Sequence, residues 1–369
     1  MTIQNKHHRW LDLIRCIAAF LVYYGHMVTV ATYAPSVPEA ISETNSHLLP
    51  MIPVGTHVMD GLELFFTRFL HAQTAVVGVC LFFFLAGYLS VDSQKKYTSR
   101  QFLFGRAVRL LPVLWIVTII CGVTLHFVQG IDFTLIEYIA QMTLTTPLIG
   151  IRGIIAGVVW TLYTEVFYYL LITIPKQINL RYIAIVEVII VLFIKAWHIT
   201  GSGNLLQIVY FLKYIPIIFI GAVIKITENK YALWQRISII GLFSVIAWAI
   251  LRFNKYLNGD TTTYPNFSTG ILALAVFLLI YALGRKDILE NRIPRSITFF
   301  SSINYTFYLS QVCIGFNIMF LLKKHVTTNA YLIEVLTLVM LIVLSASVHY
   351  LIERPSSKYG KELQNKLQL

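Results

Sequence analysis

Long apolar stretches recur along the whole chain at intervals that suit membrane-crossing helices. The pattern predicts ten of them, at residues 10–30, 73–91, 110–128, 157–174, 182–199, 206–224, 237–251, 268–283, 299–322 and 332–351. Membrane helices need about 17 to 25 residues, and the seventh stretch is the weakest of the ten. A membrane β-barrel would instead alternate apolar and polar positions in short segments. We therefore predict an all-α, polytopic transmembrane bundle.

The composition agrees with a membrane protein. Of the 369 residues, 57% are hydrophobic and only 12% are charged, whereas about 25% are charged in soluble proteins. The net charge of +12 could indicate nucleic-acid binding, but Lys and Arg also collect in the cytoplasmic loops of membrane proteins. We expect the lipid bilayer as a partner and no nucleic acid. Residues 1–369 are expected to form one integral membrane domain with no appended soluble domain.

The distribution of positive charge predicts the orientation. Lys6 and Arg9 precede the first apolar stretch, which places the N-terminus in the cytoplasm. With ten spans, the segments predicted to be cytoplasmic hold 20 of the 29 Lys and Arg residues, and the outer segments hold six. This asymmetry predicts that both termini are cytoplasmic.

The first apolar stretch contains Asp12, Arg15 and His26, which lipid does not tolerate. Arg15 and His26 are eleven residues apart, so on an α-helix they share a face, about 16 Å apart along the axis. His26 suits a general base, or else a hydrogen-bonded packing residue. Asp12 can pair with Arg15 in a purely structural contact. Ala18 and Ala19 lie between them and leave room for a neighbouring helix or for an elongated ligand.

Two arginines stand at the predicted cytoplasmic mouth of the third stretch. Arg106 and Arg109 are three residues apart and share a helical face. Arginine suits multidentate binding of phosphate. Anchoring to anionic lipid is the alternative explanation.

The fourth stretch carries a carboxylate beside aromatic residues. Glu165 follows Trp160 by five residues. Glu165 could orient a histidine or bind sugar hydroxyls, with Trp160 stacking on a sugar ring. A carboxylate satisfied by helix packing is the alternative.

Other polar features of the sequence are explained by helix packing or helix ends and need no catalytic role. The hydroxyl-rich segment 301–311 fits polar helix packing. Glu353-Arg354-Pro355 is interpreted as a stop signal that ends the last helix. The four cysteines all lie in apolar stretches and fit buried packing positions. No spacing indicates a metal site, so we predict no metal.

Several of these segments together resemble the acyltransferase-3 family of integral membrane acyltransferases. The matching segments run in the family's order over nearly the whole chain: 11–26, 80–89, 106–112 with Trp115, 160–169, 302–309 and 353–355. Ala86-Gly87 stands where the family commonly has Ser-Gly, so a hydroxyl role is not expected there. Thr161 replaces a serine of the family motif, and Tyr168 replaces a phenylalanine.

The resemblance implies a bacterial inner-membrane enzyme that transfers an acyl group, usually acetyl from acetyl-CoA, to a hydroxyl. The acceptor would be a surface polysaccharide, lipopolysaccharide or related glycan, or a lipid-linked sugar. Acyl-CoA would be a substrate, with no permanently bound cofactor.

A mechanistic hypothesis combines this implied reaction with the candidate residues and gives each residue a role. Arg106, Arg109 and Arg15 would hold the donor, whose pantetheine arm would pass Arg15, Ala18 and Ala19. His26 would act as general base, or would form an acyl-histidine. The predicted catalytic residues are His26, Glu165 and Arg15. Trp160, Glu165 and Asp12 would bind the acceptor.

Two other classes of protein stay open on the sequence alone. A secondary transporter or flippase for a polar or lipid-linked sugar also needs buried charge. A membrane scaffold or sensor would use the same charges structurally.

Overall fold

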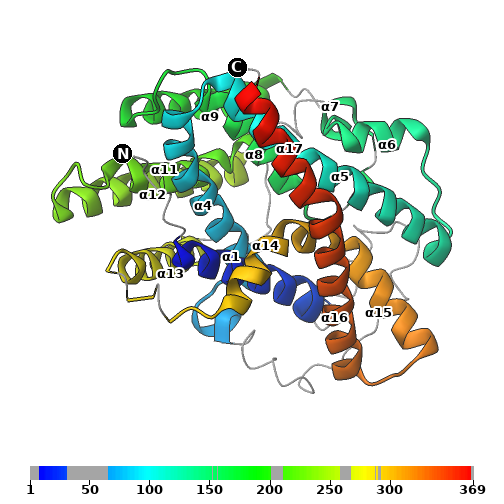
Figure 1. Ribbon diagram of the computed structural model, residues 1–369. Coiled ribbons are helices and arrows are strands. Elements are labelled where there is room, and N and C mark those ends of the chain that lie inside the picture. Colours follow the sequence, from blue (N-terminus) through cyan, green and yellow to red (C-terminus); the bar gives the residue numbers. More distant parts are fainter. Residues whose placement is uncertain are drawn as a thin grey trace.

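The structure is a computed structural model that describes residues 8–30, 65–151, 153–155, 157–200, 211–257, 267–286, 288–289 and 292–366. Every regular element in these ranges is helical (Figure 1). In chain order they are α1 (Arg9–Tyr23), η1 (Tyr24–Val30), η4 (Phe65–Phe69), α4 (Thr74–Lys96), α5 (Ser99–Gln129), α6 (Leu135–Met142), α7 (Thr146–Ile149), α8 (Trp160–Ile172), α9 (Leu180–Thr200), α11 (Ile215–Thr227), α12 (Leu233–Leu257), α13 (Phe267–Arg285), α14 (Arg295–Ser310), α15 (Cys313–His325), α16 (Ala330–Val348), η6 (His349–Glu353) and α17 (Arg354–Lys366). The all-α prediction is confirmed.

The number of membrane crossings is not confirmed at ten. Among the described residues, six helices are long and apolar enough to cross a membrane, and α14 with α15 makes a seventh if the pair is one span. Two predicted spans fall on the short helices α8 and α11, and a third falls on α1, whose 15 residues run directly into η1 and so reach Val30. A helix of 13 residues, such as α8 or α11, is only about 20 Å long, which is less than the thickness of the hydrocarbon. Residues 206–210 of the sixth predicted span lie outside the described ranges.

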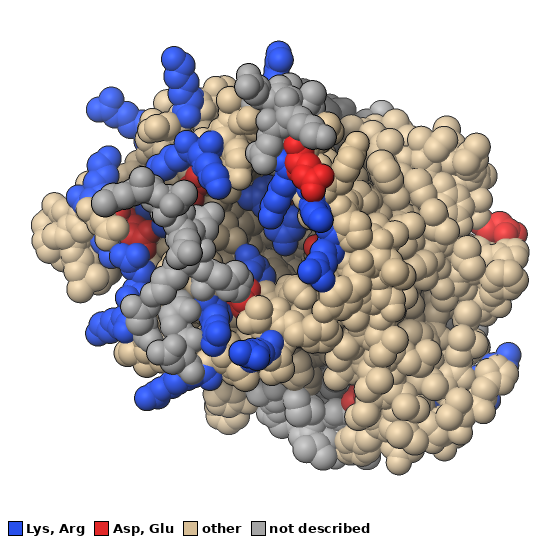
Figure 2. Space-filling view, in the orientation of Figure 1, with Lys and Arg blue, Asp and Glu red and all other residues tan. Residues whose placement is uncertain are grey.

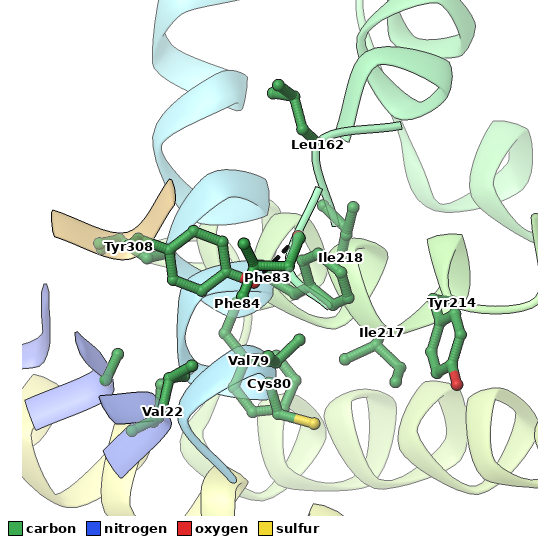
Figure 3. Close-up of a cluster of buried hydrophobic side chains, with 14 of the residues drawn as sticks. Val22, Val79, Cys80, Phe83, Phe84, Leu162, Tyr214, Ile217, Ile218 and Tyr308 are labelled. Atoms are coloured by element: carbon green, nitrogen blue, oxygen red, sulfur yellow. Dashed lines mark hydrogen bonds between the residues drawn. The ribbon is translucent and has the colours of Figure 1, made fainter. Parts of the chain in front are cut away.

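The helix α4 lies at the centre of the bundle and packs against α1, α11 and α13. Most of its apolar side chains are buried, because other helices cover α4 on several sides. Figure 3 shows the middle of α4 surrounded by side chains of α1, α8, α11 and α14: the labelled residues are Val22, Val79, Cys80, Phe83, Phe84, Leu162, Tyr214, Ile217, Ile218 and Tyr308.

Two glycines let α4 and α11 approach backbone to backbone. A Cβ added to Gly87 would overlap the carbonyl oxygen of Ile218, and one added to Gly221 would overlap that of Phe84. Small residues at such crossings replace side-chain packing with direct helix contact, as is common in membrane bundles. The pair of glycines therefore sets the distance between the central helix and α11.

Replacing Gly87 by Ala is expected to destabilise the bundle by about 1–3 kcal/mol or more, because the helices must separate to admit the methyl group. Gly241→Ala is the matched control, since its added Cβ would meet nothing within 4 Å. Thermal unfolding of the two purified variants in detergent measures the difference. Equal melting temperatures would show that the α4–α11 contact is not tight.

The helix ends that the sequence assigns to the cytoplasm lie together. Gln94 of α4 donates to the carbonyl oxygen of Ile172 at 2.5 Å, and Lys225 of α11 pairs with Asp92 at 3.0 Å. Figure 2 shows Lys and Arg side chains gathered over the upper left of one face, around a hollow, while the right of this view carries few charges. The side of the membrane on which this face lies stays a prediction.

The predicted stop at Glu353-Arg354-Pro355 is wrong. Residues Tyr331–Leu363 form one continuous helical stretch, in which α16 passes through η6 into α17. Pro355 removes a backbone N–H and crowds the carbonyl four residues earlier. A π-turn relieves this crowding without ending the helix. In Figure 1, α17 runs beside α5, against which it packs.

Candidate active site

Five helices enclose a cavity of about 140 Å³ in the bundle. They are α1, α4, α5, α8 and α14, which bring together segments from residue 15 to residue 309 of the chain. The cavity is lined by Arg15, Val79, Phe82, Phe83, Leu85, Ala86, Leu89, Arg106, Arg109, Leu110, Thr161, Leu162, Glu165, Tyr169, Ser301, Asn304, Tyr305, Tyr308 and Leu309.

Three arginines from two helices line this cavity. Arg106 and Arg109 come from α5, whose first turn is fixed by a capping box between Thr98 and Gln101. Arg15 comes from α1, and the other two arginines are close enough to repel it. Three cations in one small space favour an anionic ligand. The structure thus brings together the three residues predicted to bind the donor.

Aromatic rings hold Arg106 in place. Its guanidinium lies 4.9 Å from the centre of the Tyr169 ring and 5.2 Å from that of Phe102. Such contacts orient a guanidinium without neutralising it. Arg106 therefore keeps its charge available in the cavity.

Asp12 and Ser301 fix Arg15. The Nη1 of Arg15 donates to Oδ1 of Asp12 at 2.9 Å, and the Ser301 hydroxyl donates to the same oxygen at 2.8 Å. Asn304 donates to the backbone oxygen of Arg15 at 3.1 Å. Asp12 is buried and does not line the cavity, so its geometry is that of a residue that positions Arg15.

Replacing Ser301 by Ala is expected to cost about 1.5–3 kcal/mol of stability, because a hydrogen bond to a buried carboxylate is lost. Ser302→Ala is the matched control, since the Ser302 hydroxyl donates only to Phe299 of its own helix. Chemical or thermal unfolding in detergent compares the two. A control variant as unstable as Ser301→Ala would contradict the assigned role of Ser301.

Glu165 lies on the cavity wall, between the two ends of the cavity that residues of α8 line. Since α8 begins at Trp160, the lining residues Thr161 and Leu162 are near one end of the cavity and Tyr169 is near the other. The Tyr169 hydroxyl donates to Oε1 of Glu165. Arg106 stacks on the same tyrosine. Glu165 and the arginines thus share one cavity.

The helix α14 forms a polar wall that sequence analysis missed. Ser301, Asn304, Tyr305 and Tyr308 all line the cavity. Their spacing of three, four and seven residues from Ser301 is that of one helical face, and this periodicity was the signal that could have identified them. The Tyr305 hydroxyl donates to the backbone oxygen of Leu110 at 3.2 Å, which joins α14 to α5.

Tyr308 lines the cavity beside Thr161, away from the arginines. Its hydroxyl lies 2.9 Å from that of Thr161 and donates to the backbone of Val158 at 3.4 Å. Its ring packs edge-on against Phe82. Figure 3 shows Tyr308 reaching from α14 toward α4.

His26 does not line this cavity. It lies on the π-helical segment η1, where Nδ1 is 2.8 Å from the backbone oxygen of Val22. A carbonyl only accepts, so Nδ1 carries the proton and Nε2 of a neutral ring is the acceptor. The residue thus has the tautomer that a general base at Nε2 requires.

The residues between Arg15 and His26 make room for a helix. Ala18 and Ala19 are completely buried, and neither lines the cavity. A Cβ on Gly78 of α4 would clash with the backbone oxygen of Ala18. The close approach of α4 accounts for these small residues, whereas a ligand path along them has no cavity.

Trp160 also lies outside the cavity lining. Its ring packs 4.7 Å from that of Tyr214 and 6.0 Å from that of Phe83, between centroids. Phe83 does line the cavity, so Trp160 supports the wall from behind. Trp160 and His26 therefore lie outside the cavity that Glu165 lines.

No group of three or more His, Cys, Asp or Glu residues that could hold a metal occurs in the part of the chain that the structure describes. The comparison with curated proteins and that with solved structures gave no match. The family model Acyl_transf_3, described as an acyltransferase domain, matches residues 8–353 and so includes every residue of the cavity. The chain therefore belongs to the acyltransferase-3 family of membrane acyltransferases.

Proposed function

We propose that the protein is a membrane-bound O-acyltransferase that moves an acyl group, in the first place acetyl, from cytoplasmic acyl-CoA to a hydroxyl of a surface glycan or lipid-linked sugar. One observation carries the proposal: Arg15, Arg106, Arg109 and Glu165, which come from three separate helices, converge on one cavity. The family match supports an acyltransferase and gives no support to a transporter.

The arginines would bind the phosphates of the donor. Arg106 and Arg109 lie on the part of α5 near its first turns, which positive charge assigns to the cytoplasm. Coenzyme A carries its phosphates far from its thioester. The cavity is too small for the whole nucleotide, so the thioester arm would enter while the nucleotide stays at the mouth.

His26 would act as the general base. Its Nε2 takes the proton of the acceptor hydroxyl, whose oxygen attacks the thioester carbonyl carbon. The carbon–sulfur bond breaks, and the leaving thiolate receives the proton as free coenzyme A. An acyl-histidine intermediate is the other route, in which Nε2 itself attacks the carbonyl first.

The position of His26 outside the cavity lining sets a condition on this mechanism. A path from the cavity to His26 must open for the thioester to reach it, and in this proposal the contact between Tyr308 and Thr161 is the part that moves. Glu165 would then lie on the donor's path, where it positions the acyl group or the incoming hydroxyl. The setting is a bacterial inner membrane in this proposal.

The test supplies the purified protein with acetyl-CoA labelled in its acetyl group and with a cell-surface glycan extract. The proposal expects label in the glycan and free coenzyme A in equal amounts. Label trapped on the protein in the absence of glycan selects the acyl-histidine route. Uptake of the glycan sugar into proteoliposomes without any transfer of label would contradict the proposal.

A further inference from the structure

A buried carboxylate outside the cavity faces one of its arginines. Glu353 is on η6, between α16 and α17, and is buried. Its Oε1 lies 4.0 Å from Nε of Arg109, and its Oε2 lies 2.9 Å from Nδ1 of His349. One oxygen of the carboxylate thus faces Arg109, which lines the cavity, and the other contacts His349 one helical turn earlier.

The π-turn of η6 and the docking of α17 determine where Glu353 points. Pro355 follows the π-turn by two residues, and the Ser356 hydroxyl donates back to the Glu353 carbonyl at 3.0 Å. Beyond it, α17 packs along α5, so closely that a Cβ on Gly360 would clash with Val108. Val108 directly precedes Arg109. The last helix therefore holds Glu353 beside Arg109, the second arginine of the pair.

The geometry at Arg109 leaves its outer nitrogens for a ligand. The contact with Glu353 is at Nε, on the stem side of the guanidinium. The side chain is half exposed and lines the cavity, whereas Glu353 does not line it. At 4.0 Å the pair is an electrostatic contact without a hydrogen bond, so the carboxylate attracts the Nε side of the guanidinium. The two terminal nitrogens form the fork that suits a phosphate.

We propose that Glu353 is a positioning residue that holds Arg109 for the phosphate groups of the acyl-CoA donor, with His349 fixing the carboxylate from behind. This rests on the proposed function, because it assumes that the arginines bind a coenzyme A phosphate. It assigns to the C-terminal helical stretch a role in donor binding. Three side chains are in successive contact: His349 with Glu353, and Glu353 with Arg109.

The test is the dissociation constant of coenzyme A for the purified protein in detergent, measured by calorimetry. Glu353→Gln is expected to weaken binding about three- to tenfold, because Arg109 loses its fixed orientation. Glu353→Asp keeps the charge at a shorter reach, and its loss is expected to be smaller. Glu362→Gln is the matched control, since Glu362 is an exposed carboxylate on α17, and it should bind as the wild type does.

A double-mutant comparison separates positioning from general damage. In an Arg109→Gln background, Glu353→Gln should cause no further loss of affinity, since the residue through which it acts is gone. Unchanged affinity of the folded Glu353→Gln and Glu353→Asp proteins would overturn the inference, and so would an equal loss in both backgrounds. A wild-type protein that does not bind coenzyme A at all would overturn the proposed donor site, and the inference with it.

Discussion

Replacing His26 by Gln is expected to lower the rate of acyl transfer by about 10²- to 10⁴-fold, the range typical for loss of a positioned general base. Glutamine can keep a hydrogen bond to the Val22 carbonyl that His26 makes, but it cannot accept and release a proton at Nε2. The variant should therefore fold normally and still bind coenzyme A. Initial rates with labelled acetyl-CoA, beside a binding measurement, separate chemistry from binding.

The control for His26 is another histidine of the chain. His126 on α5 is exposed and pairs with Asp132 at 2.7 Å, away from the cavity lining. His126→Gln should transfer at the wild-type rate. A His26→Gln protein that transfers at the wild-type rate would remove His26 from the mechanism.

Replacing Arg106 or Arg109 by Gln is expected to raise the KM for acyl-CoA by about tenfold or more. A hydrogen bond to a charged group contributes about 1.5–3 kcal/mol, and 1.4 kcal/mol corresponds to a factor of ten. The double variant should lose more than either single one. The KM for the acceptor should change little, because the arginines are at the opposite end of the cavity from Thr161.

Arg100→Gln distinguishes donor binding from lipid anchoring. Arg100 is an exposed arginine in the first turn of the same helix and does not line the cavity. Donor binding predicts an unchanged KM for this variant. If Arg100→Gln raises the KM as much as Arg109→Gln does, the arginines act through the membrane surface or through the fold.

Residue types and spacing were enough to find all four charged side chains that line the cavity. A guanidinium in an apolar helix must be compensated, and the structure pairs Arg15 with Asp12 as the spacing predicted. Arg106, Arg109 and Glu165 were identified in the same way, one motif at a time. That these motifs share a cavity depends on how five helices pack, and no local pattern encodes that packing.

Helix interruptions were harder to predict than helices. The predicted span 299–322 is two helices, α14 and α15, bent by 77° relative to each other. The helix at Pro355 was predicted to end and instead continues through a π-turn. In both places tertiary packing decides the outcome, because neighbouring helices satisfy or redirect the backbone groups that an interruption frees.

The number of spans is the part of the predicted topology that the structure does not confirm. The helix α11 is apolar, but its 13 residues are nearly all buried among other helices. An apolar run that is covered by protein has the same composition as one that faces lipid. Only the packing distinguishes the two, so the count of crossings could not be read from the pattern.

The central claim is that donor and acceptor reach the protein from opposite sides of the membrane. Proteoliposomes that contain the protein in one known orientation test it, with labelled acetyl-CoA placed either on the side of the arginine cluster or on the other side. The account predicts that label reaches a glycan on the far side only when acetyl-CoA is on the arginine side, and that His26→Gln abolishes this transfer. Transfer of equal rate from either side, or transfer that persists in His26→Gln, would contradict it.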